Sequence, residues 1–450
     1  MLGLNKFNRS IKRMYNFSEL LVLFTVTLFL VVLFSFINEK TAKLPYEIGL
    51  VVFGFGFCLI LILLQAVNIT LIPEEFLKLI NQFDFNDFLI HGILCFMLFS
   101  GASSIKFNDF NEDKGLISRM AILGTLIAII VYGVLFYGLG LLFHFNLNFL
   151  ESLILGSIVA PSDPISAMSI LGKVGLPHRL SLILEGESLF NDGIAVAVFA
   201  TLLTIQEETL ASVTLGSFIG GLVTDIAGAI IIGLVIGALM FQIFKHTKNT
   251  YIKIFTSILT VMMAYLICEY LDFSGPIAAV ICGLYYATVI ADLERKGMDE
   301  TTRKLHDMFY DFWGVIDNLL NGILFLMVGL LFFAVISLED ISRMPIFVVI
   351  VGAILINSMA RIVSVAGNVV LTKEVPLGLS KKNFTIFFSW AGLKGGLCLA
   401  LVMGTEGSLA TDVYNIFVVA TYGIVFFTTV FQGLTVGKVY NKLQQSVLKN

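Results

Sequence analysis

Long apolar stretches alternate with short polar connections along the whole chain, and this pattern predicts a helical membrane protein. A helix needs about 20 predominantly apolar residues to cross the hydrocarbon core of a bilayer. The longest polar connection, 291–310, is too short to fold as a soluble domain. We therefore expect an all-α polytopic fold with thirteen transmembrane helices, at residues 17–37, 46–65, 87–103, 115–144, 148–171, 178–204, 215–244, 251–271, 275–291, 313–337, 345–371, 383–404 and 411–436.

Lys and Arg in the connections predict which side of the membrane each connection occupies. Connections after odd-numbered spans carry at least two such residues each, whereas those after even-numbered spans hold only Lys78 and Arg343. Because positively charged loops stay in the cytoplasm, we expect a cell-membrane protein with a cytoplasmic C-terminus and an external N-terminus. The segment before the first span favours the opposite side for the N-terminus, since it carries Lys6, Arg9, Lys12 and Arg13.

Two of the predicted spans are interrupted near their middle. The run 161–164, Pro-Ser-Asp-Pro, interrupts span 148–171, and proline cannot donate the hydrogen bond that a helix needs. The run 391–396, Ala-Gly-Leu-Lys-Gly-Gly, weakens span 383–404 with its glycines. Irregular backbone at membrane depth is tolerated only where protein, water or an ion satisfies it.

The interrupted spans are the fifth and the twelfth, and an odd separation inverts their orientation. Paired interrupted helices in two inverted halves indicate the binding site of a secondary transporter. We therefore expect an N-terminal segment at 1–16, a transmembrane domain at 17–436 and a short cytoplasmic tail at 437–450. Within the transmembrane domain, two inverted six-helix repeats at 17–204 and 251–436 flank a linking span at 215–244.

The span 178–204 places acidic side chains deep in an apolar stretch. A carboxylate at the bilayer centre costs about 2.5 to 3.5 kcal/mol on insertion scales, and such residues typically line an ion or proton pathway. Asp192 lies almost at the centre of the span, with Ser188 one turn before it on the same face. An ionised carboxylate is disfavoured there unless it is compensated. We therefore expect Asp192 to hold either a proton or a cation.

Oxygen ligands near Asp192 favour a hard monovalent cation. Asp192, Asp163 and Ser162 are the expected Na⁺ ligands, and Ser188 adds a further oxygen. His, Cys and Met are missing from this group, which argues against a transition metal. No cofactor is expected beyond the transported ion, for which Na⁺, Li⁺ and K⁺ all stay open.

The other buried charges are interpreted by sign and depth. Arg361 is the expected partner of Glu187, because each would be prohibitive alone in lipid. Lys394 is expected to balance the negative ends of the half-helices, and Glu185 to help funnel cations. Further polar groups are interpreted as snorkelling residues, interhelical hydrogen bonds or pathway lining, namely Glu47, His91, Asp225, Asp317 and Asn321. A structural role is favoured for Glu47 and Asp225.

Composition agrees with a membrane protein. Hydrophobic residues make up 58% of the 450 residues and charged residues only 13%, which is too apolar for one soluble core. The net charge of -4 argues against a nucleic-acid partner. The five cysteines are scattered through apolar stretches, so we expect buried thiols rather than disulfides or metal ligands.

Four runs together resemble the sodium/proton exchangers of the cation/proton antiporter-1 family, of the NhaP and NHE type. They are LPYEIGL at 44–50, APSDP at 160–164, GESLFNDG at 186–193 and SWAGLKGG at 389–396. The resemblance covers most of the chain, in the family's order. It implies a homodimer of thirteen-span protomers, each with a scaffold and a mobile core, that exchanges Na⁺ for H⁺ in pH homeostasis.

The same resemblance implies roles for single residues. Asp192 would be the acid that binds the ion and exchanges the proton, with Asn191 as its neighbour. Asn191 stands where electrogenic relatives have Asp, which implies electroneutral one-for-one exchange. Ser162 and Asp163 match the family's Thr-Asp pair, and Glu187 matches the acid of its buried ion pair, with Arg361 as the base.

This chain departs from the family pattern at three points. Pro161-Ser162 replaces a small residue followed by Thr, so ion affinity and selectivity are expected to differ. Lys394 replaces an Arg of many members, which excludes bidentate pairing there. The long regulatory tail of animal exchangers is absent, so we expect no regulation of that kind.

Three alternatives accompany this interpretation. K⁺/H⁺ exchange stays open, because cavity size cannot be read from the sequence. A cation channel could use the same acids, but broken helices in inverted repeats favour alternating access over a continuous pore. An intramembrane enzyme is disfavoured, because no G-x-S-x-G or H-E-x-x-H motif occurs.

Overall fold

Every regular element that the computed structural model describes is a helix. It describes residues 17–67, 88–105, 107–163, 167–168, 171–172, 175–207, 215–297, 300–336, 345–372, 375–376 and 379–448. The first half of the chain forms α2 (Phe17–Lys40), α3 (Tyr46–Ala66), η1 (Phe88–Ile93), α6 (Leu94–Ser104), α7 (Phe107–Arg119), η2 (Met120–Gly124), α8 (Thr125–Phe143), α9 (Phe149–Val159) and α11 (His178–Glu207). The second half forms α12 (Leu215–His246), α13 (Thr250–Tyr270), α14 (Gly275–Arg295), α15 (Glu300–Ile336), α16 (Ile346–Val370), α17 (Lys381–Ala391), α18 (Gly396–Met403), α19 (Thr411–Phe426), η6 (Phe427–Gln432) and α20 (Gly433–Leu448).

The lengths of these helices confirm the all-helical membrane fold. Within the described ranges, ten helices are long and apolar enough to cross a bilayer, or eleven when α17 and α18 count as one span bent by 57°. Two shorter apolar helices, Phe88–Ser104 and Phe149–Val159, accompany them. Each predicted span overlaps a described helix, while the total of thirteen spans and the internal repeats stay predictions.

Helices extend beyond the apolar stretches that predicted them. The polar connection at 291–310 is largely helical, because α14 continues to Arg295 and α15 already begins at Glu300. Polar residues of good helix propensity can continue a helix outside the membrane, and apolar length alone does not mark its end. The predicted tail is also mostly helical, since α20 ends at Leu448. Predictions on residues 1–16, Lys78, Pro164 and Arg343, and on the side chain of His91, lie outside what the structure describes.

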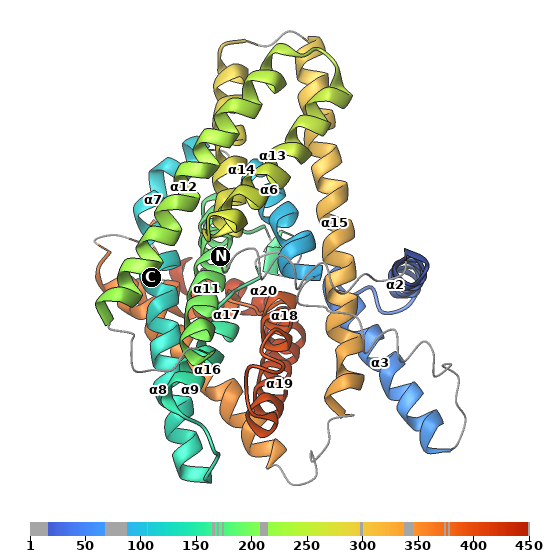
Figure 1. Cartoon of the computed structure of the whole chain (residues 1–450), viewed down its shortest axis with the longest axis vertical. Helices are drawn as coiled ribbons and strands as arrows, with labels where there is room; N and C mark the ends of the chain where they lie inside the picture. The colour runs from blue at the N-terminus through green and yellow to red at the C-terminus, as the bar shows by residue number, and fades with distance from the viewer. Residues whose placement is uncertain are drawn as a thin grey trace.

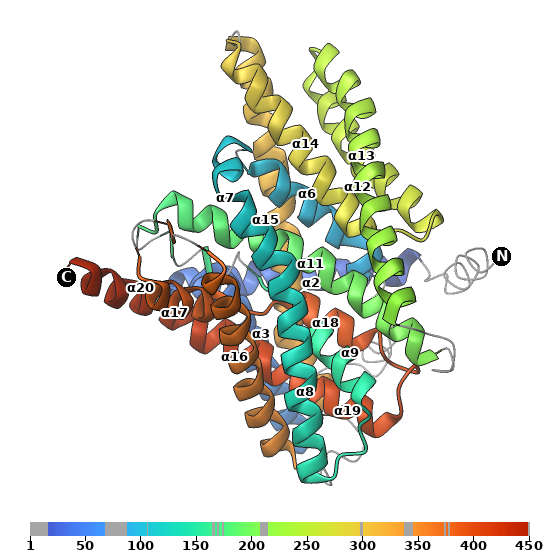
Figure 2. The same ribbon diagram turned by 90° about the vertical axis from the view of Figure 1, so that its left-hand side faces the viewer.

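The helices form two groups along the long axis of the molecule (Figure 1). The helices α12, α13 and α14 gather at one end beside α15, which runs along most of the length. The helices α8, α9, α16 and α19 lie at the other end, with α6, α11 and α18 between the groups (Figure 2). The middle layer therefore contains the acidic span α11 and the second half of the broken span, α18.

Close packing joins α3 to α15. A Cβ atom on Gly329 would lie 2.8 Å from the Val51 carbonyl oxygen and 2.9 Å from the Gly54 Cα atom, so only glycine allows this approach. An aromatic cluster fixes the other end of α15, where the rings of Phe99 and Trp313 lie 4.7 Å apart. The Trp313 Nε1–H group donates to Ser257 Oγ at 3.0 Å.

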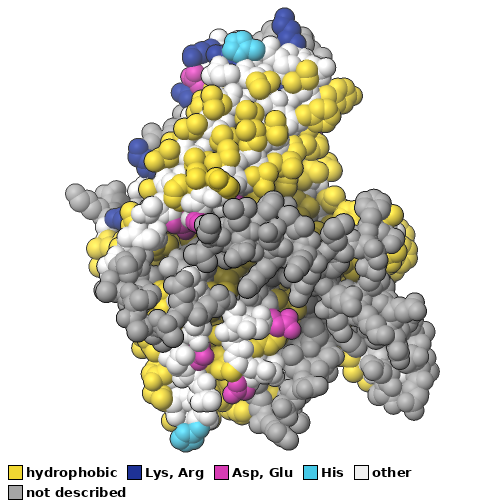
Figure 3. All heavy atoms as spheres, viewed as in Figure 1, with side chains coloured by type: hydrophobic (Ala, Val, Ile, Leu, Met, Phe, Trp, Pro, Cys, Tyr) yellow, Lys and Arg dark blue, Asp and Glu magenta, His cyan; other side chains and the backbone are white. Residues whose placement is uncertain are grey.

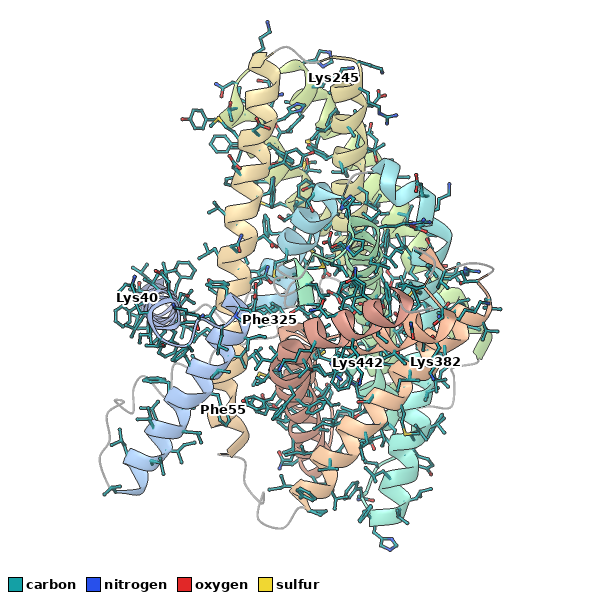
Figure 4. The ribbon with its side chains drawn as sticks, turned by 180° about the vertical axis from the view of Figure 1, so that it is seen from behind. Lys40, Phe55, Lys245, Phe325, Lys382 and Lys442 are labelled. Carbon is teal, nitrogen blue, oxygen red and sulfur yellow. The ribbon has the colours of Figure 1, made fainter. Side chains whose placement is uncertain are left out.

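The surface of the α12–α14 end is apolar, with positive charge at its tip. Figure 3 shows hydrophobic side chains over these helices and Lys, Arg and His side chains at the tip. Figure 4 labels Lys245 there, in the last turn of α12. Exposed apolar side chains such as Ile231 of α12 and Phe255 of α13 cover the sides of these helices. Such a continuous apolar surface suits contact with lipid rather than water.

Candidate ion-binding site

The two interrupted helices meet at their breaks. The helix α9 begins with a capping box between Asn148 and Glu151 and ends at Val159, just before Pro161. The other break separates α17 from α18 over residues 392–395. The Asp163 N–H group donates to the Leu393 carbonyl oxygen at 2.8 Å. Each break therefore satisfies a backbone group that the other leaves unpaired.

Lys394 ties the same two breaks together through its side chain. It is buried, and its Nζ atom donates to the Ala160 carbonyl oxygen at 2.8 Å, at the C-terminal end of α9. A positive charge at a helix C-terminus compensates the partial negative charge of the free carbonyl groups. The positively charged Lys394 side chain thus lies at the C-terminal end of a half-helix, as its charge predicted.

Asp192 lies on the wall of a cavity of about 410 Å³. Its Oδ1 atom is buried and has no hydrogen-bond partner among the described residues. A buried polar atom without a partner is unfavourable, and on the wall of a cavity it marks a place for an ion, a proton or water. Ser162, Asp163 and Ser188 line the same cavity. Four of the five predicted ion-binding residues therefore share one cavity.

Asp163 lies against the second break. A Cβ atom on Gly395 would be 2.9 Å from both the Cβ and the Oδ2 atoms of Asp163, so the absence of a side chain at 395 makes room for this carboxylate. Gly395 and Gly396 also line the cavity.

Asn191, the fifth predicted residue, is placed differently. Its Oδ1 atom accepts from the Ser162 N–H group at 3.2 Å, and its Nδ2 atom donates to Ser162 Oγ at 2.7 Å and to Glu187 Oε1 at 3.2 Å. Asn191 is not among the residues that line the cavity. Ser188 Oγ donates to the Ser162 carbonyl oxygen. Both side chains therefore hold the first break against α11.

Glu187 and Arg361 form a bidentate ion pair between α11 and α16. Arg361 Nη1 and Nη2 donate to the two Glu187 carboxylate oxygens, at 2.7 Å each. The side chains are only 1% and 8% exposed, respectively. Bidentate geometry is the strongest arrangement of such a pair. It is also the pairing that charge balance alone suggested.

Polar residues of uncertain interpretation divide into two groups. Glu185 of α11, Glu47 of α3, and Asp317 and Asn321 of α15 all line the cavity. Asp225 of α12 does not line it. The sequence could not show that the residues of the first group share a cavity, because they come from three helices far apart in the chain.

Thr428 and Thr429 were not singled out by the sequence. Both are buried in η6, and their hydroxyl groups contact the backbone of Lys394 in the second break. The only sequence signal was a pair of adjacent hydroxyl residues deep in an apolar span, which is common in membrane helices.

Comparison with known proteins gives a consistent result. Residues 16–442 match the family described as "Sodium/hydrogen exchanger, transmembrane". The Na(+)/H(+) antiporter NhaP of Pseudomonas aeruginosa is 29% identical over 431 residues, which cover 92% of this chain and 95% of that protein. The Na(+)/H(+) antiporter ApNhaP of Aphanothece halophytica is 30% identical over 438 residues, covering 95% and 75%.

A solved structure shares the fold. It is the sodium proton antiporter MjNhaP1 from Methanocaldococcus jannaschii, which superimposes with a TM-score of 0.70 over 94% of this chain and 99% of that one. Sequence identity is 20%, so this likeness concerns the fold alone.

Proposed function

The chain belongs to the family of transmembrane sodium/hydrogen exchangers, and we propose that it is a secondary active Na⁺/H⁺ antiporter of the cell membrane. The observation that carries this proposal is Asp192, whose buried and unpartnered Oδ1 atom lies on a cavity at two broken helices. Relatives that cover nearly all of the chain are named Na(+)/H(+) antiporters, which supports the same activity.

In the proposed mechanism, Asp192 carries a proton in one half of the cycle and Na⁺ in the other. Asp163, Ser162 and Ser188 line the same cavity and supply further oxygen ligands for Na⁺. The two loads exclude each other because both need the same carboxylate charge. The site opens to one side of the membrane at a time, as the interrupted helices of secondary transporters do.

Electroneutral exchange follows from the loads at Asp192. A protonated carboxyl is neutral, and a carboxylate with one Na⁺ is also neutral, so each loaded form carries the same net charge. Asn191 adds no charge, and its amide atoms are already bonded to Ser162 and Glu187. We therefore assign Asn191 to positioning the first break rather than to binding the cation.

The cavity supports an inward-facing arrangement. It reaches Ser104 and Ile105 at the end of α6, directly before the Lys106–Lys114 connection that the charge bias assigns to the cytoplasm. Glu47, Glu185 and Asp317 line the same space, and acidic walls raise the local concentration of cations. We propose that these acids serve entry from the cytoplasm, with the C-terminus on that side and a second copy of the chain completing a homodimer.

Exchange in proteoliposomes tests the proposal. Wild-type protein is expected to exchange Na⁺ and Li⁺ for H⁺, and Asp192→Asn to abolish exchange, because an amide keeps the shape but binds neither load. Asp225→Asn is the matched control, since Asp225 lies away from the cavity. Exchange with K⁺ but without Na⁺ would instead establish the K⁺/H⁺ alternative. Wild-type rates in a correctly inserted Asp192→Asn variant would contradict the proposal.

A further inference from the structure

We propose that Thr428 and Thr429 are positioning residues that hold both helix breaks and thereby set the cation affinity of the Asp192 site. This inference rests on the proposed exchange of a cation for a proton. It concerns residues outside the cavity, because neither threonine lines it.

The two threonines bind both backbone groups of a single residue. The Lys394 N–H group donates to Thr428 Oγ1 at 3.0 Å, and Thr429 Oγ1 donates to the Lys394 carbonyl oxygen at 2.9 Å. The Thr428 hydroxyl group in turn donates a hydrogen bond to the Val425 carbonyl oxygen at 3.2 Å. Lys394 lies in the break, where no helix satisfies these groups, and an unsatisfied buried backbone group is strongly disfavoured.

The local helix geometry explains how adjacent side chains reach one residue. Thr428 and Thr429 lie in η6, a π-helical segment between α19 and α20. The wider turn of a π-helix brings consecutive side chains closer to one face than an α-helix does, and such segments frequently mark functional sites. η6 thus directs both hydroxyl groups toward the break.

The same long helix also holds the segment before the break. The Trp390 Nε1–H group of α17 donates to Thr435 Oγ1 of α20 at 3.0 Å, and the rings of Phe387 and Tyr440 lie 5.4 Å apart. The helices α17 and α20, on which Figure 4 labels Lys382 and Lys442, pack against each other. The second break is therefore held in two ways. The backbone N–H and carbonyl groups of Lys394 bind η6, and the preceding helix α17 packs against α20.

Lys394 and its neighbour Leu393 connect the second break to the first break. The Lys394 side chain binds the Ala160 carbonyl oxygen, and Leu393 binds the Asp163 N–H group. Asp163 in turn lies on the Asp192 cavity. A shift of the Lys394 backbone would therefore displace Asp163 relative to Asp192, which changes Na⁺ coordination more than proton binding, because a proton needs only one oxygen.

The test compares Thr428→Val and Thr429→Val, which replace the hydroxyl with a methyl group, with the rescue variant Thr429→Ser. Thr421→Val is the matched control, because Thr421 is buried on α19 but its hydroxyl has no partner among the described residues. Apparent KM for Na⁺ is measured in proteoliposomes as a function of pH, with Li⁺ or K⁺ if the wild-type protein prefers it. Hydrogen–deuterium exchange of the two breaks is followed on the same samples.

The two Val variants are expected to raise the KM about three- to tenfold, the effect of losing one buried hydrogen bond. Weaker Na⁺ binding lets protons compete better, so the acidic limb of the pH profile shifts to higher pH by about 0.5 to 1 unit. Exchange of amide hydrogens increases at 160–163 as well as at 392–395. Thr429→Ser and Thr421→Val stay close to wild type.

Unchanged KM and unchanged hydrogen exchange at 160–163 in both Val variants would overturn the inference. Equal changes in Thr421→Val would also overturn it, since any buried hydroxyl would then have the same effect. Wild-type protein that exchanges none of these cations would contradict the proposed function instead. Hydrogen exchange would still decide, without transport, whether the threonines hold both breaks.

Discussion

At the scale of single residues, the Glu187–Arg361 pair shows how a charge is accommodated at membrane depth. Each side chain alone would be an uncompensated charge away from water, which is strongly unfavourable. Two parallel hydrogen bonds of 2.7 Å bind the pair. Glu187 also accepts from Asn191, which links the pair to the first helix break. The pair thus stabilises the surroundings of Asp192 without entering the cavity.

Glu187→Gln and Arg361→Gln are each expected to destabilise the protein by about 3 to 5 kcal/mol, because the remaining partner stays buried and unpaired. The double variant removes both charges, so its loss is smaller than the sum of the single losses. Thermal melting of the three variants in detergent measures the coupling. Strictly additive losses would mean that the two residues do not interact.

Charged residues gave a clearer signal in the sequence than most neutral ones. Arg361 and Glu187 were paired by sign and depth, since few charges lie in the spans. Thr428 and Thr429 carry no charge, and hydroxyl groups occur throughout apolar helices. Asn191 was expected next to the ion, but only the structure gives the bonds that commit its amide to Ser162.

At the scale of helices, the site is the contact between two breaks. Pro161 and the glycines at 392, 395 and 396 marked where the helices are interrupted. Which backbone groups the breaks exchange could not be predicted, because Asp163 and Leu393 are far apart in the chain. Helix ends were also missed where polar residues continue a helix, as at the start of α15.

Gly395→Ala is expected to raise the apparent KM for Na⁺ about tenfold or more, because a small displacement of a positioned group has large effects. The added methyl would meet Asp163 at 2.9 Å and push its carboxylate from the site. Gly138→Ala of α8 is the control, since a Cβ atom there meets nothing within 4 Å. Dose–response curves in proteoliposomes compare the two. Wild-type KM values in Gly395→Ala would show that Asp163 does not coordinate the cation.

At the scale of the whole molecule, one cavity joins residues that lie far apart in the chain. Asp192 lies on α11 and Asp163 at the first break, whereas Asp317 and Glu47 come from α15 and α3. Hydrophobic periodicity predicted the helices, but it does not determine which of them share a cavity, since this depends on long-range packing. The close approach at Gly329 holds α3 and α15 together as one wall.

Membrane potential is expected neither to drive nor to slow exchange at fixed ion gradients, because both loaded forms of Asp192 are neutral. A potential acts only on net charge that moves across the membrane. Proteoliposomes with and without a K⁺ potential clamped by valinomycin measure this, once K⁺ is shown not to be a substrate. A rate that follows the voltage would require a second mobile charge, and Asp163 would be the first residue to replace.

In the proposed mechanism one carboxylate, Asp192, binds either the proton or the cation. Proton release on addition of Na⁺ to purified protein in weakly buffered detergent solution tests it without transport. We expect one proton to be released per Na⁺ bound at a pH where the site is protonated. Asp192→Asn should abolish this release and Asp225→Asn should retain it. Na⁺ binding without proton release, or undiminished release from Asp192→Asn, would contradict it.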